Sequence, residues 1–411
     1  MQKILINSYA CCPNMGSEPG MGWNWCVNLA RHCELHIITE GEFRPQIEAT
    51  VPTLEQGRNM HFYYNPVTEE VRRMCWNQGD WRFYHYYKQW QKKTAEMARE
   101  ICKKEKIDIL HQLNMIGFRE PGYLWRVSRE TGIPFVWGPV DAKERFPMAY
   151  AAEAPLKTRV FLRLKNIITA GQLRYGRRVH QAARTAAVVV SASSNSVESF
   201  RRYFGIESPL INETGTYPTT ASEGRRADPA TFDIVWVGKM DFRKQLGLAI
   251  RSVATAFHRD IRLHIVGSGN VEGYLHEAEK QGIADLCVIH GSVSHDEVLR
   301  LMRSADLFLF TSVAEGTPHV VLEAIGCGLP VLCFDTCGQG DCVTDEVGYK
   351  IPLSNPERSA KEFGEKIEYL YRHREVLEEM SRNCRKRAEE LSWENKARKM
   401  AAMYGRFAGR S

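Results

Sequence analysis

Two glutamates, Glu315 and Glu323, lie in the stretch Thr311–Pro330, which reads TSVAEGTPHVVLEAIGCGLP. An apolar run, Asp306–Phe310, comes directly before this stretch and predicts a buried strand. Carboxylates accept hydrogen bonds from sugar hydroxyls, and they recognise ribose diols in this way in dinucleotide-binding folds. The two glutamates therefore predict a site for a ligand that contains both a sugar ring and a ribose.

The residues between these glutamates predict a helix. Thr317 is a suitable N-cap and Pro318 a suitable first helical residue, and a glycine and a proline about ten residues later end the helix. Glu315 then lies just before the helix, and Glu323 lies about 7–9 Å along its axis from Pro318. The two carboxylates therefore serve different parts of a ligand. One alternative stays open on these residues alone: Glu315 compensates the helix dipole, and Glu323 belongs to an ordinary polar face.

A second loop with suitable chemistry follows the predicted strand Asp233–Gly238. It contains Gly238, Lys239 and Lys244 in the sequence VGKMDFRK. Two flexible cations between the end of a strand and the start of a helix can converge on one diphosphate. The alternative is a pair of solvated surface lysines.

A third loop contains Gly16 and Ser17 in the sequence GSEPGMGW, after the predicted first strand. Ser17 suits an N-cap, Pro19 suits a first helical turn, and glycines let the backbone approach a ligand closely. Amides at the start of a helix favour phosphate. The spacing differs from the dinucleotide fingerprint, so a purely structural glycine-rich turn is the alternative.

Loops of this kind connect parallel strands to crossover helices. The sequence alternates short β-branched runs with helical stretches, which is the pattern of such a scaffold. We expect an α/β protein with two doubly wound, Rossmann-like domains that face a central cleft, because ligands bind at the carboxyl ends of parallel strands. The expected parts are an N-terminal domain (1–210), a linker (211–231), a C-terminal domain (232–388) and a helix that crosses back to the first domain (389–411). The expected strands are Lys3–Ser8, Leu35–Thr39, Ile107–His111, Phe135–Gly138, Ala187–Ser191, Asp233–Gly238, Arg262–Gly267, Leu286–His290, Asp306–Phe310 and Val331–Phe334.

The composition is that of a soluble globular protein, with 44% apolar and 25% charged residues in 411. Twelve cysteines occur without a CxxC pair, which indicates reduced, mostly buried thiols rather than a metal site. The first apolar run is too short for a signal peptide, and no window resembles a membrane span. We therefore expect a cytoplasmic protein.

The positive charge is concentrated in one segment. Residues 157–184 contain eight Lys and Arg and no acid, whereas the formal charge of the whole chain is +6, so the remainder carries 6 − 8 = −2. This distribution argues against a nucleic-acid-binding protein. It favours an anionic membrane surface as a partner, which would make the protein peripheral on the inner face of the cytoplasmic membrane. The aromatic-rich stretch Trp76–Trp90 could add interfacial anchors. The alternative is a helix packed on the first sheet with solvated arginines outside.

The second half of the chain resembles family 4 of the retaining glycosyltransferases, which have the GT-B fold. The family's Glu-x7-Glu motif is matched by Glu315 and Glu323. Its Gly-Arg…Lys diphosphate motif is similar to Gly238, Lys239 and Lys244, with Lys in place of the usual Arg at 239. Three further segments resemble family landmarks: Ile265–Gly269, His290–Val293 and Ser392–Glu394.

The first half resembles a bacterial exopolysaccharide and lipopolysaccharide subgroup of that family. The resemblance lies in the glycine-rich loop and in three segments, His111–Asn114, Arg119–Pro121 and Trp137–Val140. The subgroup usually continues with glycines where this chain has Asp141-Ala142. The family often carries a histidine after the fourth strand that contacts the donor sugar. His111 and Leu113 both fit that register, and His111 is the candidate.

The resemblance implies a retaining hexosyltransferase that moves a sugar from a nucleoside-diphosphate sugar to a glycan or lipid-linked glycan in cell-surface polysaccharide biosynthesis. It implies no cofactor and no metal. The alternatives are a nucleotide-sugar epimerase or a phosphorylase of the same fold, and a non-catalytic carbohydrate-binding partner subunit. The implied catalytic residues are Glu315, Lys239, Lys244 and His111. The implied donor-binding residues are Gly16, Ser17, Gly238, Gly267, Gly316, Thr317, Pro318, His319, Val320 and Glu323.

Overall fold

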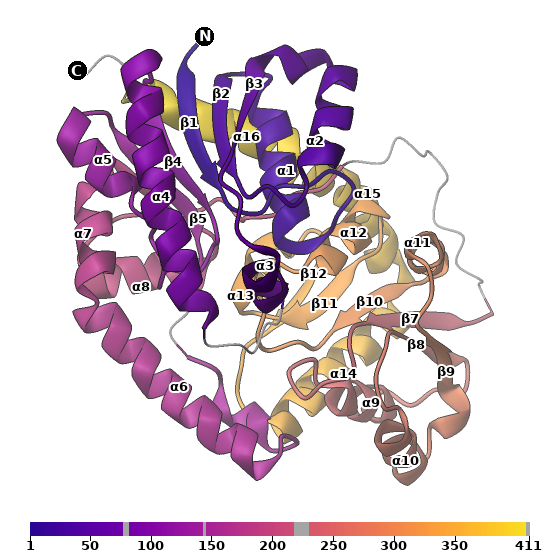
Figure 1. The fold of residues 1–411 in the computed structure, drawn as a ribbon. Helices are drawn as coiled ribbons and strands as arrows, with labels where there is room; N and C mark the ends of the chain where they lie inside the picture. Colours follow the sequence, from indigo (N-terminus) through magenta and orange to yellow (C-terminus); the bar gives the residue numbers. More distant parts are fainter. Residues whose placement is uncertain (77–81, 143–144, 218–229, 408–411) are drawn as a thin grey trace. The chain divides into compact units, whose positions relative to one another are not determined.

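The computed structural model describes residues 1–76, 82–142, 145–217 and 230–407 (Figure 1). The chain forms two compact units. The first unit consists of Met1–Glu144, Ala170–Glu213 and Trp393–Ser411, and the second of Arg145–Thr169 and Thr214–Ser392. Residues 145–169, which lie within the expected N-terminal domain, thus group with the second unit, whereas the C-terminal residues from Trp393 group with the first.

The first unit is built on a sheet of six parallel strands in the order β3-β2-β1-β4-β5-β6 (Figure 1). The strands are β1 (Lys3–Ser8), β2 (Glu34–Thr39), β3 (Met60–Tyr64), β4 (Ile109–Asn114), β5 (Phe135–Val140) and β6 (Val188–Ser191). The helices are α1 (Ser17–Leu29), α2 (Arg44–Thr50), α3 (Glu69–Trp76), α4 (Phe83–Lys104), α5 (Leu124–Thr131), α7 (Arg177–Thr185), α8 (Ser194–Phe204) and α16 (Trp393–Gly405), with short 3-10 turns η1 (Val51–Thr53) and η2 (Glu55–Asn59).

Both faces of this sheet carry apolar residues that are buried under helices. Ile4 and Ile6 point to the face covered by α1 and α16, and Leu5 points to the face covered by α4, α5 and α7. The last helix is held to α1 by an edge-on contact between Trp25 and Trp393, whose ring centroids are 6.0 Å apart. This packing explains why the strands read as continuous apolar runs in the sequence.

The second unit has the same architecture, with six parallel strands in the order β12-β11-β10-β7-β8-β9. The strands are β7 (Phe232–Val237), β8 (Ile261–Val266), β9 (Cys287–Gly291), β10 (Leu307–Phe310), β11 (Val331–Phe334) and β12 (Gly348–Ile351). The helices are α9 (Leu246–Thr255), α10 (Glu272–Lys280), α11 (His295–Ser304), α12 (His319–Gly326), α13 (Cys337–Cys342), α14 (Pro356–Arg372) and α15 (Arg374–Glu390), with 3-10 turns η3 (Met148–Ala151) and η4 (Ala284–Leu286). One further helix, α6 (Leu156–Tyr175), belongs to the second unit up to Thr169 and to the first from Ala170.

In each unit, the first and the fourth strand along the chain lie side by side in the middle of the sheet. These strands are β1 and β4 in the first unit and β7 and β10 in the second. At β1–β4 and at β7–β10 the order of the strands therefore reverses, and such a switch point opens a crevice at the carboxyl ends of the strands. The prediction of two doubly wound α/β domains is confirmed. The sequence missed one strand in each unit, β3 and β12, and both lie at an edge of their sheet.

Among the helices of the described residues, none is both long enough and apolar enough to cross a membrane.

Candidate active site

The switch point of the second unit brings two loops together, one after β7 and one after β10. The hydroxyl of Thr311 donates to the carbonyl of Lys244 (2.8 Å), and the backbone N–H of Val313 donates to the carbonyl of Arg243 (3.0 Å). These bonds fix the loop that carries Glu315 against the loop that carries Lys244.

As a result, Lys244 and Glu315 form an ion pair. The distance from Lys244 Nζ to Glu315 Oε1 is 2.7 Å, and only 17% and 20% of the two side chains are exposed. The hydroxyl of Ser312 donates to the same Oε1 at 2.6 Å, and Lys244 lies over the ring of Phe310, 5.3 Å from its centroid. An anion that binds Lys244 must therefore compete with Glu315 for it.

Lys239 lies in the same loop but points into solvent, and the structure does not bring it into the ion pair. Arg243 lies between the two lysines in the sequence. Its Nε and Nη2 donate to the two carboxylate oxygens of Asp241 at 3.2 and 2.7 Å. Burial alone would raise the pKa of Asp241. The hydrogen bonds and the positive charge of Arg243 have the larger combined effect, so the pKa lies below its usual value. Sequence reasoning missed Arg243, although its position between Lys239 and Lys244 was a signal.

Close backbone approach explains the glycines of these loops. Gly267 has φ +142°, and a Cβ there would lie 1.8 Å from the carbonyl oxygen of Gly238. The N–H of Gly238 donates to Val266 O at 3.0 Å, and the N–H of Gly267 donates to Gly291 O at 2.8 Å. Only glycine fits at position 267, because any side chain would separate the loops after β7 and β8.

The prediction for the start of α12 was wrong by one residue. The helix begins at His319, and Pro318, not Thr317, takes the N-cap position. Thr317 is buried against Gly338, whose N–H donates to Gly316 O at 3.0 Å, so this segment is tied to α13 before the helix begins.

Glu323 and His319 lie on α12, apart from the ion pair. Glu323 is half-buried, and its Oε1 is 3.0 Å from Nε2 of His295 at the start of α11. His319 is exposed at the start of α12, and its Nδ1 is 3.0 Å from the hydroxyl of Thr214. Val320 follows it and is half-buried. The two glutamates thus have different partners.

The first unit places Gly16 and Ser17 on the surface at the start of α1. The prediction that Ser17 caps this helix was wrong, because Ser17 is its first residue, has φ +55° and makes no capping bond. The glycines that packing requires are Gly20 and Gly22, where a Cβ would lie 1.8 Å from Met15 O and 2.2 Å from Ala10 O.

His111 lies in the core of the first unit, on β4, and is fully buried. Its Nε2 donates to Gly138 O at 2.6 Å, and its Nδ1 accepts from the hydroxyl of Tyr404 on α16 at 2.6 Å. Burial lowers the pKa of His111 to about 4, against the opposing effect of the Gly138 carbonyl. Both ring nitrogens are therefore engaged by the protein, and the side chain has no surface open to a ligand.

Glu18 is the second residue of α1, and the sequence analysis did not identify it as a site residue. Burial raises its pKa to about 7, although the N–H of Ile116 donates to its Oε1 at 3.5 Å. Its other oxygen is buried and has no hydrogen-bond partner among the described residues. A carboxyl group in this state is a candidate ligand contact of the first unit.

Residues 221–389 match the family model of glycosyl transferases group 1. This match lies within the second unit. A relative from Methanocaldococcus jannaschii, described as the uncharacterized glycosyltransferase MJ1607, is 29% identical over 175 residues, which are 42% of this chain and 44% of that protein. This chain thus spans less than half the length of the first curated relatives that it matches.

Two solved structures match nearly the whole chain. Anabaena Alr3699/HepE in complex with UDP has a TM-score of 0.63 and 14% identity, with 99% of this chain and 100% of that chain covered. The apo form of the lipopolysaccharide outer core galactosyltransferase WaaB has a TM-score of 0.65 and 14% identity, with 98% and 100% covered. The likeness shows that this chain has the GT-B fold.

Proposed function

We propose that the protein transfers a hexose from a nucleoside-diphosphate sugar to a hydroxyl of a glycan or lipid-linked glycan, with retention of configuration. The observation that carries the proposal is the Lys244–Glu315 ion pair at the switch point of a group 1 glycosyltransferase domain. UDP as the nucleotide is supported by the HepE complex, and a role in cell-surface polysaccharide synthesis is supported by the likeness to WaaB.

In the proposed reaction, positive charge builds on the sugar ring and negative charge on the leaving diphosphate. Lys244 turns from Glu315 to the diphosphate, and Lys239 closes on it from the exposed side of the same loop. Glu315, released from the lysine, faces the sugar ring and offsets its charge. Fixed charges of this kind act strongly in a site that excludes water. Glu323, held on α12, accepts hydrogen bonds from the ribose.

We further propose that the transfer needs no divalent metal and no cofactor. Two lysines and the backbone amides at the start of α12 supply the positive charge that a metal would otherwise provide. In addition, the sequence contains no Asp-x-Asp motif of the kind that binds Mg²⁺ or Mn²⁺ beside a diphosphate.

An anionic membrane surface is proposed as a further partner, through α6. The helix buries Leu162 and Leu173 on one side, yet it exposes seven large apolar or aromatic side chains. At about 100° per residue these fall within a stripe roughly 140° wide. The exposed residues, of which Ile167 is 70% and Phe161 61% accessible, are Leu156, Val160, Phe161, Leu164, Ile167, Ile168 and Tyr175.

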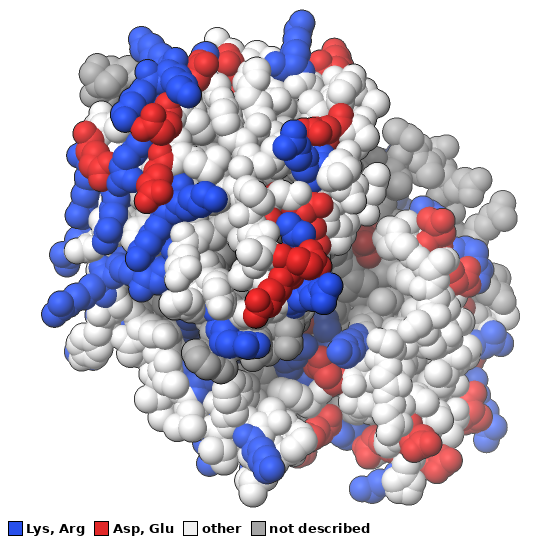
Figure 2. Space-filling view, viewed as in Figure 1, with Lys and Arg blue, Asp and Glu red and all other residues white. Residues whose placement is uncertain are grey.

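Basic side chains accompany this stripe. Lys157, Arg163, Lys165 and Arg174 are all exposed on α6, and the surface over the helix is mostly uncharged with single basic side chains (Figure 2). This combination suits the interface of an anionic bilayer, where each cation contributes about 1 kcal/mol. A lipid-linked acceptor would then be delivered from the same surface.

Some residues that the sequence assigned to the membrane surface are engaged or buried within the protein. Arg178 pairs with Glu120 at 2.9 Å and is not available to lipid headgroups. In the aromatic stretch Trp76–Trp90, Tyr87 and Trp90 are buried in the first unit and cannot anchor in a bilayer. Trp76 is exposed, whereas residues 77–81 lie outside the described residues.

The proposed transfer predicts separable roles for the two glutamates. Glu315→Gln should lower turnover by about 10²–10³-fold with little change in affinity for the nucleotide, since the charge acts on the transition state. Glu323→Ala should weaken binding of UDP itself about tenfold, because a ribose contact is lost. Calorimetry with UDP and GDP, and transfer assays with their sugars and a glycan acceptor, measure both effects.

Glu357→Gln is the matched control, because Glu357 is an exposed glutamate in the first turn of α14. It should behave as the wild type. Unchanged nucleotide affinity in Glu323→Ala contradicts the ribose contact. A donor that epimerises without any acceptor-dependent product contradicts the transferase.

For the metal-free reaction, we expect full turnover in excess chelator and a loss of about 10²-fold or more in Lys244→Ala, which leaves the diphosphate uncompensated. The measurement is initial rate with and without chelator. Activity that disappears in chelator and returns with Mg²⁺ or Mn²⁺ would show that the proposal is wrong.

The membrane proposal predicts sedimentation with anionic vesicles at low salt and little sedimentation with neutral ones. Phe161→Ser/Ile167→Ser and, separately, Arg163→Glu/Lys165→Glu should each reduce the bound fraction at least tenfold, since apolar insertion and charge both contribute. Phe257→Ser is the control, since Phe257 is a 49% exposed aromatic residue outside α6. Equal binding to both vesicle types, or variants that bind as the wild type does, would rule the surface out.

A further inference from the structure

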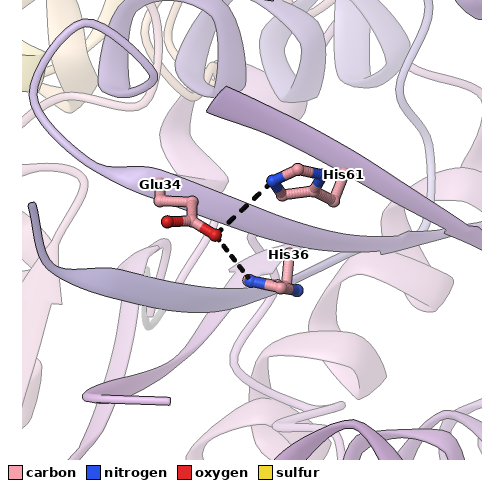
Figure 3. Close-up of side chains that lie close together, drawn as sticks. All are labelled: Glu34, His36 and His61. Atoms are coloured by element: carbon pink, nitrogen blue, oxygen red, sulfur yellow. Dashed lines mark ion pairs between the residues drawn. The ribbon is translucent and has the colours of Figure 1, made fainter. Parts of the chain in front are cut away.

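Three potential metal ligands meet at the edge of the first sheet, on strands β2 and β3 (Figure 3). His36 and His61 are directly paired across the two strands, and Glu34 lies two residues before His36, so all three side chains share one face. They lie near the amino-terminal ends of their strands. The loops discussed above follow the carboxyl ends, so this cluster is separate from them.

The two distances from Glu34 to the histidines fit the ligands of a tetrahedral ion better than they fit hydrogen bonds. Glu34 Oε1 is 3.5 Å from Nε2 of His36 and 3.5 Å from Nε2 of His61. Ligands at about 2.0–2.2 Å from a tetrahedral Zn²⁺ are separated from one another by roughly 3.3–3.6 Å. A hydrogen bond between nitrogen and oxygen is normally about 2.7–3.2 Å long.

His36 is the decisive member of the cluster. It is 2% exposed, and its Nε2, which faces Glu34 and His61, has no hydrogen-bond partner among the described residues. Its Nδ1 lies 3.0 Å from the hydroxyl of Tyr63, which can accept the Nδ1 proton. In that tautomer Nε2 presents a lone pair to the centre of the cluster, and such an outer hydrogen bond is typical of metal-binding histidines.

Among the described residues, Lys3 is the lysine or arginine that pairs with the carboxylate of Glu34. Its Nζ lies 3.2 Å from Glu34 Oε1 but only 2.7 Å from Glu105. An ion that bound Glu34 would displace Lys3 from this carboxylate and leave Lys3 paired with Glu105. His61 is 45% exposed on its side chain, so a water molecule can take the fourth position of the ion.

We infer that Glu34, His36 and His61 form a binding site for a divalent transition-metal ion of the zinc class. Two histidines and one carboxylate are a ligand set that such ions prefer. The ion links the edge strand β3 to β2. The inference is independent of the proposed sugar transfer, which uses no residue of this cluster.

The test is Zn²⁺ binding to the full chain, measured by calorimetry and by the visible absorption of Co²⁺ as a substitute. We expect one ion per chain from this site, raised thermal stability of the wild type with Zn²⁺, and a tetrahedral Co²⁺ spectrum. His61→Ala removes an exposed ligand without disturbing the core, and it should abolish all three signals. Glu34→Gln should weaken binding at least tenfold.

The control is His276→Ala, which removes an 83% exposed histidine that lies 3.6 Å from Glu279 in the second unit. The chain has twelve cysteines that can also bind zinc, so the difference between wild type and His61→Ala is the readout, not total uptake. Equal stoichiometry and Co²⁺ spectra in these two proteins would overturn the inference. Sugar transfer by His61→Ala should match the wild type, which separates failure of this site from failure of the proposed reaction.

Discussion

The ion pair between Lys244 and Glu315 is the interaction on which the proposed site depends. At 2.7 Å and with about one-fifth of each side chain exposed, it joins the loops that follow the two central strands of the second unit. Removing one partner leaves a largely buried charge without compensation. The pair is the contact that an anion binding to Lys244 must replace, and it supplies the two charges that the proposed reaction needs. In the proposed reaction, a diphosphate would provide a second anion for Lys244, and the exchange of partners would free the carboxylate of Glu315.

Backbone constraints put this pair in place. The carbonyls of Arg243 and Lys244 accept bonds from the loop after β10, so the side chains of that loop are directed toward Lys244. Gly267 and Gly338 remove the side chains that would hold neighbouring loops apart. Each contact joins segments far apart in the sequence, and the order of the strands in the sheet makes these segments neighbours. The first unit repeats this strand order. Its histidine on the central strand β4, His111, is buried in the core and bonded to Tyr404 of the last helix.

Much of the fold could be predicted from sequence, because buried parallel strands are continuous apolar runs. The exceptions have physical causes. β3 and β12 are edge strands, and their half-exposed residues weaken the apolar signal. The start of α12 was misplaced by one residue because Thr317 packs on Gly338, a tertiary contact that a capping preference does not register.

Within the site, residue types were easier to predict than contacts. The spacing of Glu315 and Glu323 indicated two roles, and the structure gives them different partners, Lys244 and His295. The direct pairing of Lys244 with Glu315 was not predictable, since it depends on the register of two loops. The role of His111 depended on Tyr404, 293 positions away. The cluster of Glu34, His36 and His61 was hidden because β3 was not recognised, and without that strand His61 has no neighbour.

A crystal structure of the protein with UDP bound is the most direct test of the central claim. The account predicts that the diphosphate lies within hydrogen-bond distance of Lys244 Nζ and of the amides at the start of α12. It also predicts that Glu315 has left Lys244 and that Glu323 contacts the ribose. UDP bound elsewhere, with Lys244 and Glu315 still paired at hydrogen-bond distance, would contradict the account.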